Sequence, residues 1–309
     1  MQSFRGLSGF VAAFSALTAP AATATTIADI CGECVPERFA SCGGFLEGAA
    51  FARDGTLWVV DVISGAIRSV APDGTCTQRA TTGGAGNGAR FHKDGRLFIA
   101  DIQRGILAFD TKTLRLETVV DSFEGRKLPS ANDMVFDDEG GLYFTEPHNT
   151  GVLDPTGNVF YLPPATGAAL QKVATGLAFP NGIVLSADRQ LLLVGQWADK
   201  SIVAIPTVTN KEAVRVTYTW ARTVGGVGPD GMAQDARGNL YWAIFGGGAI
   251  GVAAPDGVPI GTIKLPEGAG PYVTNLAFHG GWLYATEATK GEIWRVRAKN
   301  PGETLYGQR

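Results

Sequence analysis

Short runs of apolar residues recur along the chain, and turns rich in Asp and Gly separate them. A typical run is Leu57-Trp-Val-Val, which follows Asp54-Gly-Thr, and another is Leu142-Tyr-Phe-Thr, which follows Glu139-Gly-Gly. Turns of the Asp-Gly type join antiparallel strands. No long stretch beyond the N-terminal segment has the periodicity of a helix. The pattern therefore predicts an all-β protein built from short antiparallel strands.

The runs are organised in six similar units. Each unit opens with a polar residue and an apolar strand, then continues through a turn into a second strand and a third. The opening residues are Glu47, Asn87, Asn132, Asn181, Asp230 and Asn275, spaced 40 to 49 residues apart. Four-stranded repeats of this length are typical of β-propellers. We predict a six-bladed β-propeller with four-stranded antiparallel blades over residues 45–309. A tandem of β-sandwiches would not explain one polar residue at the same place in every unit.

The last unit ends soon after its third strand. We expect the N-terminal arm, residues 25–44, to supply the missing strand from about residues 26–41 and so close the ring. Four cysteines lie in or near this arm, at Cys31, Cys34, Cys42 and Cys76. An even number in an exported chain indicates disulfides. The pairing is not readable from sequence, and a metal or redox role for Cys31 and Cys34 is the alternative.

Residues 1–24 have the layout of a secretory signal peptide. One positive charge at Arg5 precedes an uncharged, mostly apolar stretch, and Ala22-Thr23-Ala24 is a small-x-small cleavage signal. Pro20 and several polar residues interrupt the apolar stretch, which argues against the alternative of a membrane anchor. We expect an exported protein, periplasmic or secreted, with no membrane attachment after cleavage.

Charge narrows the range of partners. The net charge is −3 and no basic stripe is present, so nucleic-acid binding is not expected.

A propeller's innermost strands line its channel, so the six opening residues should converge there as a ring of oxygen-bearing side chains. Such a ring suits a hard cation, and Glu47 with Asp230 would match a divalent charge. The alternative is a hydrogen-bonded polar plug with trapped water.

At this point the motifs resemble a known family, that of senescence marker protein, gluconolactonase and luciferin-regenerating enzyme, with diisopropylfluorophosphatase as a wider relative. The resemblance covers about residues 45–298. It rests on ordered motifs: Leu46-Glu47-Gly48, Ser130-Ala-Asn132-Asp133, Leu142-Tyr-Phe-Thr-Glu-Pro147, Phe179-Pro-Asn181-Gly182 and Gly228-Pro-Asp230-Gly231-Met232. It implies a metal-dependent hydrolase that opens a lactone, with one divalent ion, calcium first and Zn²⁺, Mn²⁺ or Mg²⁺ as alternatives.

The resemblance also implies roles for individual residues. Glu47, Asn181 and Asp230 would hold the metal, with Asn132 a ligand or close to it. Asp230 would also be the catalytic base or nucleophile. Asp133 is assigned from its position directly after a ligand: we expect it to orient the ligands, bind a second ion or contact substrate, with a hydrogen bond along the strand as the alternative.

Four further residues are assigned from their positions. His148 departs from the family's usual Pro-x-Tyr-Gly element and is expected on the rim, as a proton shuttle or substrate contact, with a solvated loop residue as the alternative. Asn87 and Asn275 are expected to contact substrate or to shape the channel, and Trp197 to wall the pocket. A second polar set is expected to make hydrogen bonds between blades: Asp61, Asp101, Glu146, Gln196 and Glu287.

The favoured function is hydrolysis of a small lactone through polarisation of its carbonyl by the metal and attack assisted by Asp230. The alternatives are a related esterase or phosphotriesterase and a non-catalytic ligand-binding propeller. The expected partner is a small-molecule lactone or ester, and the expected assembly is a monomer or a weak homo-oligomer.

Overall fold

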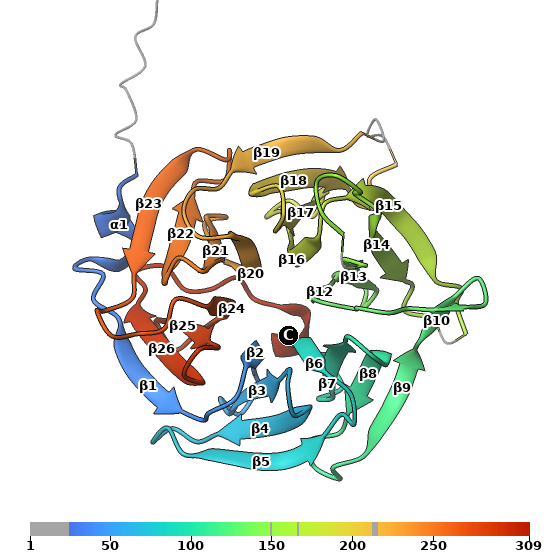
Figure 1. The fold of residues 1–309 in the computed structure, drawn as a ribbon, viewed down its shortest axis with the longest axis horizontal. Helices are drawn as coiled ribbons and strands as arrows, with labels where there is room; N and C mark the ends of the chain where they lie inside the picture. The colour runs from blue at the N-terminus through green and yellow to red at the C-terminus, as the bar shows by residue number, and fades with distance from the viewer. Residues whose placement is uncertain (1–24, 149, 166, 212–215) are drawn as a thin grey trace, which may run out of the picture.

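A computed structural model describes residues 25–148, 150–165, 167–211 and 216–309. In these residues, six four-stranded antiparallel sheets surround a central channel (Figure 1), so the predicted six-bladed β-propeller is confirmed. The predicted signal peptide lies outside the described residues. Among the residues described, no helix is long and apolar enough to cross a membrane.

The first three blades are consecutive along the chain. From the channel outward they are β2 (Leu46–Phe51), β3 (Leu57–Asp61), β4 (Ala66–Val70) and β5 (Cys76–Thr81); β6 (Gly86–Phe91), β7 (Leu97–Asp101), β8 (Gly105–Phe109) and β9 (Leu116–Val120); and β12 (Met134–Phe136), β13 (Leu142–Glu146), β14 (Gly157–Leu162) and β15 (Gln171–Leu177). A small hairpin, β10 (Ser122–Phe123) and β11 (Arg126–Lys127), precedes the third blade.

The remaining blades complete the ring. They are β16 (Pro180–Leu185), β17 (Leu191–Gln196), β18 (Ser201–Pro206) and β19 (Tyr218–Arg222); β20 (Gly228–Gln234), β21 (Leu240–Phe245), β22 (Ala249–Ala253) and β23 (Pro259–Lys264); and β24 (Val273–His279), β25 (Trp282–Glu287), β26 (Glu292–Arg297) and β1 (Glu37–Ser41).

The sixth blade joins the two ends of the chain. β1 pairs antiparallel with β26, with Glu37 opposite Arg295 and Ser41 opposite Glu292. A short helix, α1 (Ile27–Cys31), precedes β1 and packs near β23. The N-terminal arm thus supplies the outermost strand of a blade whose other three strands come from the C-terminal part of the chain.

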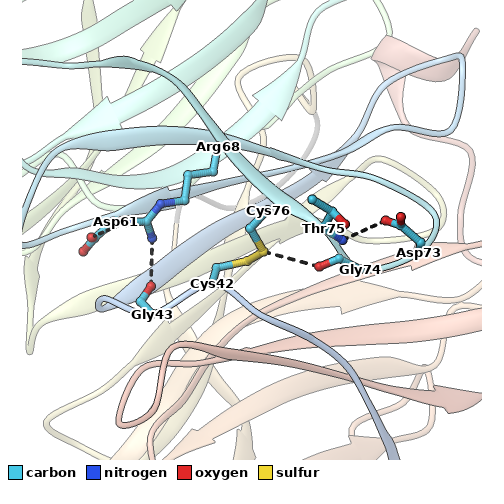
Figure 2. Close-up of a disulfide and its surroundings, with 8 residues drawn as sticks. All are labelled: Cys42, Gly43, Asp61, Arg68, Asp73, Gly74, Thr75 and Cys76. Carbon is cyan, nitrogen blue, oxygen red and sulfur yellow. Dashed lines mark hydrogen bonds and ion pairs between the residues drawn. A yellow bond between two sulfur atoms is a disulfide. The ribbon is translucent and has the colours of Figure 1, made fainter.

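Two disulfides reinforce this arm. Cys42, just after β1, is bonded to Cys76 at the start of β5, which ties the closing strand to the first blade (Figure 2). Arg68 strengthens the same junction by donating to the Gly43 carbonyl at 2.8 Å while it pairs with Asp61. Cys31 and Cys34 form a local bridge at the end of α1. These pairings resolve what the sequence had left open.

The hydrophobic core lies between neighbouring blades. Buried aromatic side chains lie in the second strands of four blades: Trp58 between blades one and two, Tyr143 between three and four, Trp242 between four and five, and Tyr284 between six and one. Their repeated position in the sequence follows from this packing, because each blade buries one face against the next.

The C-terminal segment covers one end of the channel, and Figure 1 shows the C-terminus at the centre of the ring. Gly302 forms a bridge with Asp235, and Glu303 donates its backbone N–H to the Gln234 carbonyl. The 3₁₀ turn η1 (Tyr306–Gln308) packs Tyr306 against Phe136. The inner strands end on this side, so the residues that begin these strands lie at the opposite mouth.

Candidate active site

Five of the six ring residues lie at a bulge of their inner strand, whereas Asn132 lies just before β12. In the first blade Glu47 is opposite Val60 while Ala50 is opposite Trp58, so three steps along β2 match two along β3. Equivalent register shifts occur within the described strands at 86–89, 180–183, 229–232 and 273–276. A bulge redirects side chains out of the ordinary alternation. This irregularity explains how one polar residue per blade can lie at the channel while its neighbours remain in the core.

Glycine follows the ring residue in four blades because adjacent inner strands approach closely there. A Cβ on Gly48 would lie 2.4 Å from the Asn87 carbonyl oxygen, and one on Gly182 would lie 2.3 Å from that of Asp230. Such separations are too short for any side chain at these positions. The recurring polar-Gly pair therefore reflects the tight contact of the blades around the site.

All six ring side chains are buried. Asn275 donates from Nδ2 to Glu47 Oε2 at 3.2 Å, and its Oδ1 accepts the Leu276 N–H at 2.9 Å. Both polar atoms of Asn275 are therefore engaged in orienting the ring. Asn87, at 7%, is the most exposed of the six, and its contact with substrate stays a prediction.

Two carboxylates of the ring have raised pKa values. Burial, followed by the charge of Asp133, raises the pKa of Glu47 to about 8. Burial also raises the pKa of Asp230 well above its ordinary value, and the charges of Glu47 and Asp133 add to the rise while the Asn181 side chain opposes it. Like charges held together in a dry site disfavour ionisation. A positive charge bound between these carboxylates would offset their mutual repulsion and stabilise their ionised forms.

Asp133 belongs to the same electrostatic cluster and pairs with Arg90, a residue that the sequence did not lead us to predict. Arg90, buried in β6, lies with its Nη2 3.6 Å from Asp133 Oδ2 and 3.3 Å from the Met232 carbonyl. Asp133 Oδ1 accepts the Met134 N–H at 2.8 Å, which is the strand hydrogen bond considered as an alternative. Burial raises the Asp133 pKa, and Arg90 opposes the rise. One sequence signal could have identified Arg90: it is charged at a repeat position where the two neighbouring units have the apolar residues Ala50 and Val135.

Several buried oxygens of the cluster lack a hydrogen-bond partner. They are Asn132 Oδ1, Asp133 Oδ2 and Asp230 Oδ1. A buried polar atom without a partner is costly and calls for an explanation. The formal charges of Glu47, Asp133, Asp230 and Arg90 sum to −2, so the donor set fits a divalent cation. No group of three or more His, Cys, Asp and Glu side chains with metal-binding geometry occurs in the described residues; two of the four predicted ligands are amides.

His148 lies on the rim, where its imidazole is 49% exposed. Its Nδ1 is 2.7 Å from Glu146 Oε1, and Glu146 in turn accepts from Asn158 at 2.8 Å. The His148 N–H donates to Ser130 Oγ at 2.9 Å. Ser130 has a positive φ of 76° two residues before Asn132. The structure therefore connects His148 to the segment that carries Asn132, and the pairing with Glu146 leaves Nε2 facing away from the carboxylate.

The second polar set holds loops within blades, so the expectation of hydrogen bonds between blades is wrong. Asp61 accepts the Phe45 N–H at 3.0 Å, and Gln196 Oε1 accepts the Ala178 N–H at 2.9 Å. In each pair, both residues belong to the same blade or its entry loop. The reason is geometric: the second strand ends beside the loop that enters its own inner strand, and that loop has N–H groups to satisfy.

Trp197 follows β17 at the same mouth and has aromatic neighbours. Its ring centroid is 5.1 Å from that of Phe179 and 5.9 Å from that of Phe245. Phe245 is the last residue of β21. Phe179 was missed, although it precedes Pro180-Asn181 directly and so had to enter the mouth with them.

The fold and this cluster define the class: a six-bladed β-propeller with a buried acid and amide ring at one mouth of its channel. The chain belongs to the SMP-30/gluconolactonase/LRE-like family, whose sequence profile matches residues 46–289. The family predicted from the motifs is therefore confirmed.

Individual relatives agree with this assignment. The lactonase drp35 of Staphylococcus epidermidis is 32% identical over 234 residues, which cover 72% of this chain and 70% of the relative. A gluconolactonase structure from Xanthomonas campestris has a TM-score of 0.77 at 24% identity, covering 88% of this chain and 92% of that one. A calcium-binding protein, regucalcin, from Agrobacterium tumefaciens has a TM-score of 0.73 at 20% identity, covering 88% and 96%. At these identities the two structures bear on the fold.

Proposed function

We propose that the protein is a divalent-metal-dependent hydrolase that opens a small lactone, a reaction on a carboxylic ester bond. The observation that carries the proposal is the buried cluster of charge −2, in which Asn132 Oδ1 and Asp230 Oδ1 have no hydrogen-bond partner. Family membership and the lactonase names of relatives support the reaction class.

Glu47, Asn132, Asn181 and Asp230 would hold the ion. Their donors are oxygens alone, which favours Ca²⁺, and the calcium-binding relative supports the same choice. When bound, the ion would polarise the lactone carbonyl and stabilise the charge that develops on its oxygen.

The chain's own residues supply the rest of the mechanism. Asp230 accepts the proton of the attacking water, or it attacks the carbonyl itself and water then cleaves the resulting anhydride to release the hydroxy acid. Burial fixes the position of Asp230, which offsets the low basicity of a carboxylate close to a cation. Asn275 keeps Glu47 oriented. The positive charge of Arg90 compensates the negative charge of Asp133. His148, with its Nδ1 held by Glu146, would return a proton to the departing alkoxide.

The test is metal removal and restoration. The mature protein is dialysed against chelator, Ca²⁺, Zn²⁺, Mn²⁺ or Mg²⁺ is added back, and sugar lactones, alkyl lactones, aryl esters and a phosphotriester are offered. We expect turnover of lactones that returns with metal and is lost in Asp230→Ala. Absence of metal-dependent turnover would overturn the proposal, and turnover restricted to the phosphotriester would move the protein to the alternative class.

We also propose that the protein is exported. The two disulfides support this location, since such bonds persist in oxidising compartments. Cell fractionation with the full-length chain tests it: the processed protein should appear outside the cytoplasm, and Arg5 with the apolar stretch should be absent from its N-terminal sequence.

A further inference from the structure

Five aromatic side chains form a continuous wall at the mouth of the channel. Trp197 contacts Phe179 and Phe245, and Phe245 stacks on Tyr272 with ring centroids 4.5 Å apart and an interplanar angle of 3°. Phe45 adds to the other side of Phe245 at 6.4 Å. These residues, which we call the aromatic wall, come from four different blades and meet only in the folded ring.

The wall lies next to the predicted metal ligands. Phe45 is two residues before Glu47, and Phe179 is two residues before Asn181. Phe245 is opposite Gly228 in the register of β20 and β21, and Gly228 is two residues before Asp230. Since the inner strands begin at this mouth, the wall borders the acid and amide ring along the sector of blades four, five, six and one.

The aromatic wall is partly exposed and one of its residues is strained, which is unusual for residues with a purely structural role. Tyr272 is 39% exposed and Val227, in the same sector, is 40% exposed. Phe179, Trp197, Phe245 and Phe45 are partly exposed as well. Phe179 has a φ of +57°, a conformation that costs a bulky residue on the order of 1–3 kcal/mol and persists chiefly at functional sites.

Three polar side chains of the same sector already make hydrogen bonds within the protein. Gln196 bonds the Ala178 N–H and Ser201, and Lys200 donates to the Gly226 carbonyl. Asn275 donates to Glu47 and accepts from the Leu276 N–H. A polyhydroxylated lactone needs donors and acceptors for each hydroxyl, and a site that leaves those hydroxyls unpaired binds it poorly.

We propose that the preferred substrate carries an apolar or aryl group next to the lactone ester, and that the aromatic wall binds this group while the carbonyl lies over the acid and amide ring. The inference rests on the proposed lactonase function and adds its substrate class. Stacking against Trp197 and Phe245 would orient the ring, because offset or edge contacts between aromatic groups are favourable.

Two readouts test the proposal. The first is the ratio of kcat/KM for a benzo-fused lactone, dihydrocoumarin, to that for glucono-δ-lactone, with the calcium-loaded enzyme. The second is calorimetric binding of the corresponding lactams, in which an amide replaces the ring ester and no hydrolysis is needed. We expect the apolar lactone and the apolar lactam to be preferred. Trp197→Ala and Phe245→Ala should each lower both preferences about 10- to 100-fold, as expected for the loss of an apolar contact.

Tyr218→Ala is the matched control. Tyr218 is 47% exposed, close to Tyr272, but it begins the outer strand β19 at the opposite end of the blade; its loss should change either ratio less than twofold. Trp197→Phe should restore most of the preference. A wild-type preference for the sugar lactam, or unchanged ratios in folded Trp197→Ala and Phe245→Ala proteins, would overturn the proposal. Lactam binding without turnover of any lactone would refute the lactonase function and leave the aromatic wall's specificity standing.

Discussion

Asn275 Nδ2 donates a hydrogen bond of 3.2 Å to Oε2 of Glu47, and it thereby links the inner strand of the last blade to that of the first. The two residues are 228 positions apart in the sequence. The contact places an amide donor against a buried carboxylate that would hold the metal. It also lies at the junction where the propeller ring closes.

Replacing Asn275 with Ala should weaken metal binding. Glu47 would lose the donor that orients it, and loss of such outer contacts typically costs 10- to 100-fold in metal affinity. Calorimetric titration of Ca²⁺ into the chelator-treated protein measures the change. Asn210→Ala serves as control, because Asn210 is a partly exposed loop residue whose amide bonds the Gln190 carbonyl; equal affinities in both variants would contradict the orienting role.

The metal-free protein should lose stability as pH rises from about 4.5 toward 8. The Glu47 pKa is raised in the folded state to about 8, so the folded protein binds a proton that the unfolded chain releases above its ordinary value of 4.5. Stability from this group is therefore complete below that value and declines across the interval. Thermal unfolding at several pH values should show a falling Tm, with a smaller fall in Glu47→Gln. Added Ca²⁺ should reverse the trend, and a wild-type Tm that rises across this interval would refute the assignment.

Arg90→Met should destabilise the fold by about 3–5 kcal/mol, because it leaves Asp133 as a buried charge without its partner. Urea unfolding measures the loss. In the double variant Arg90→Met/Asp133→Asn, much of that loss should return, since both charges are then absent. Additive losses would show that the 3.6 Å pair contributes no coupling.

His148→Gln should lower kcat about 100-fold if the imidazole transfers a proton, in line with the usual contribution of general acid–base catalysis. The shape of the pH–rate profile should also change, which a loss of loop structure alone would not produce. Glu146→Gln should have a weaker effect in the same direction, because Glu146 positions Nδ1. An unchanged profile in His148→Gln would assign this residue to the solvated loop instead.

Removing the Cys42–Cys76 bridge with a double serine variant should cost about 4 kcal/mol, because the bridge closes a loop of 34 residues. The matched variant lacking Cys31–Cys34 should lose about 2 kcal/mol, since that loop spans only 3 residues. Urea unfolding under non-reducing conditions compares the two. A larger loss for the shorter loop would contradict the loop-closure argument.

The repeat was the part of the fold that could be predicted from sequence. Glu47, Asn87 and their equivalents recur because every inner strand meets the same channel, and the glycines beside them recur because neighbouring strands approach too closely for a Cβ. The local pattern of turns and strands is repeated six times, so a weak signal in one unit is reinforced by the others.

Other features depended on contacts between distant segments. The guanidinium of Arg90 meets Asp133 across a gap between blades, and the aromatic wall gathers Phe45, Phe179 and Phe245 from different units. In the sequence each of these residues is a single departure from the repeat. The spacing of residues in the sequence does not predict which of these non-repeated residues will contact one another in the folded protein.

The sequence by itself determined the number of blades, the residue that each blade contributes to the channel and the family, because these follow from local periodicity and ordered motifs. The tertiary structure decided which oxygens of the ring remain without hydrogen-bond partners, which residue compensates the charge of Asp133, and that Cys42 is bonded to Cys76. The physical reason is that burial and charge coupling are set by distances through space, which arise only when the ring has closed.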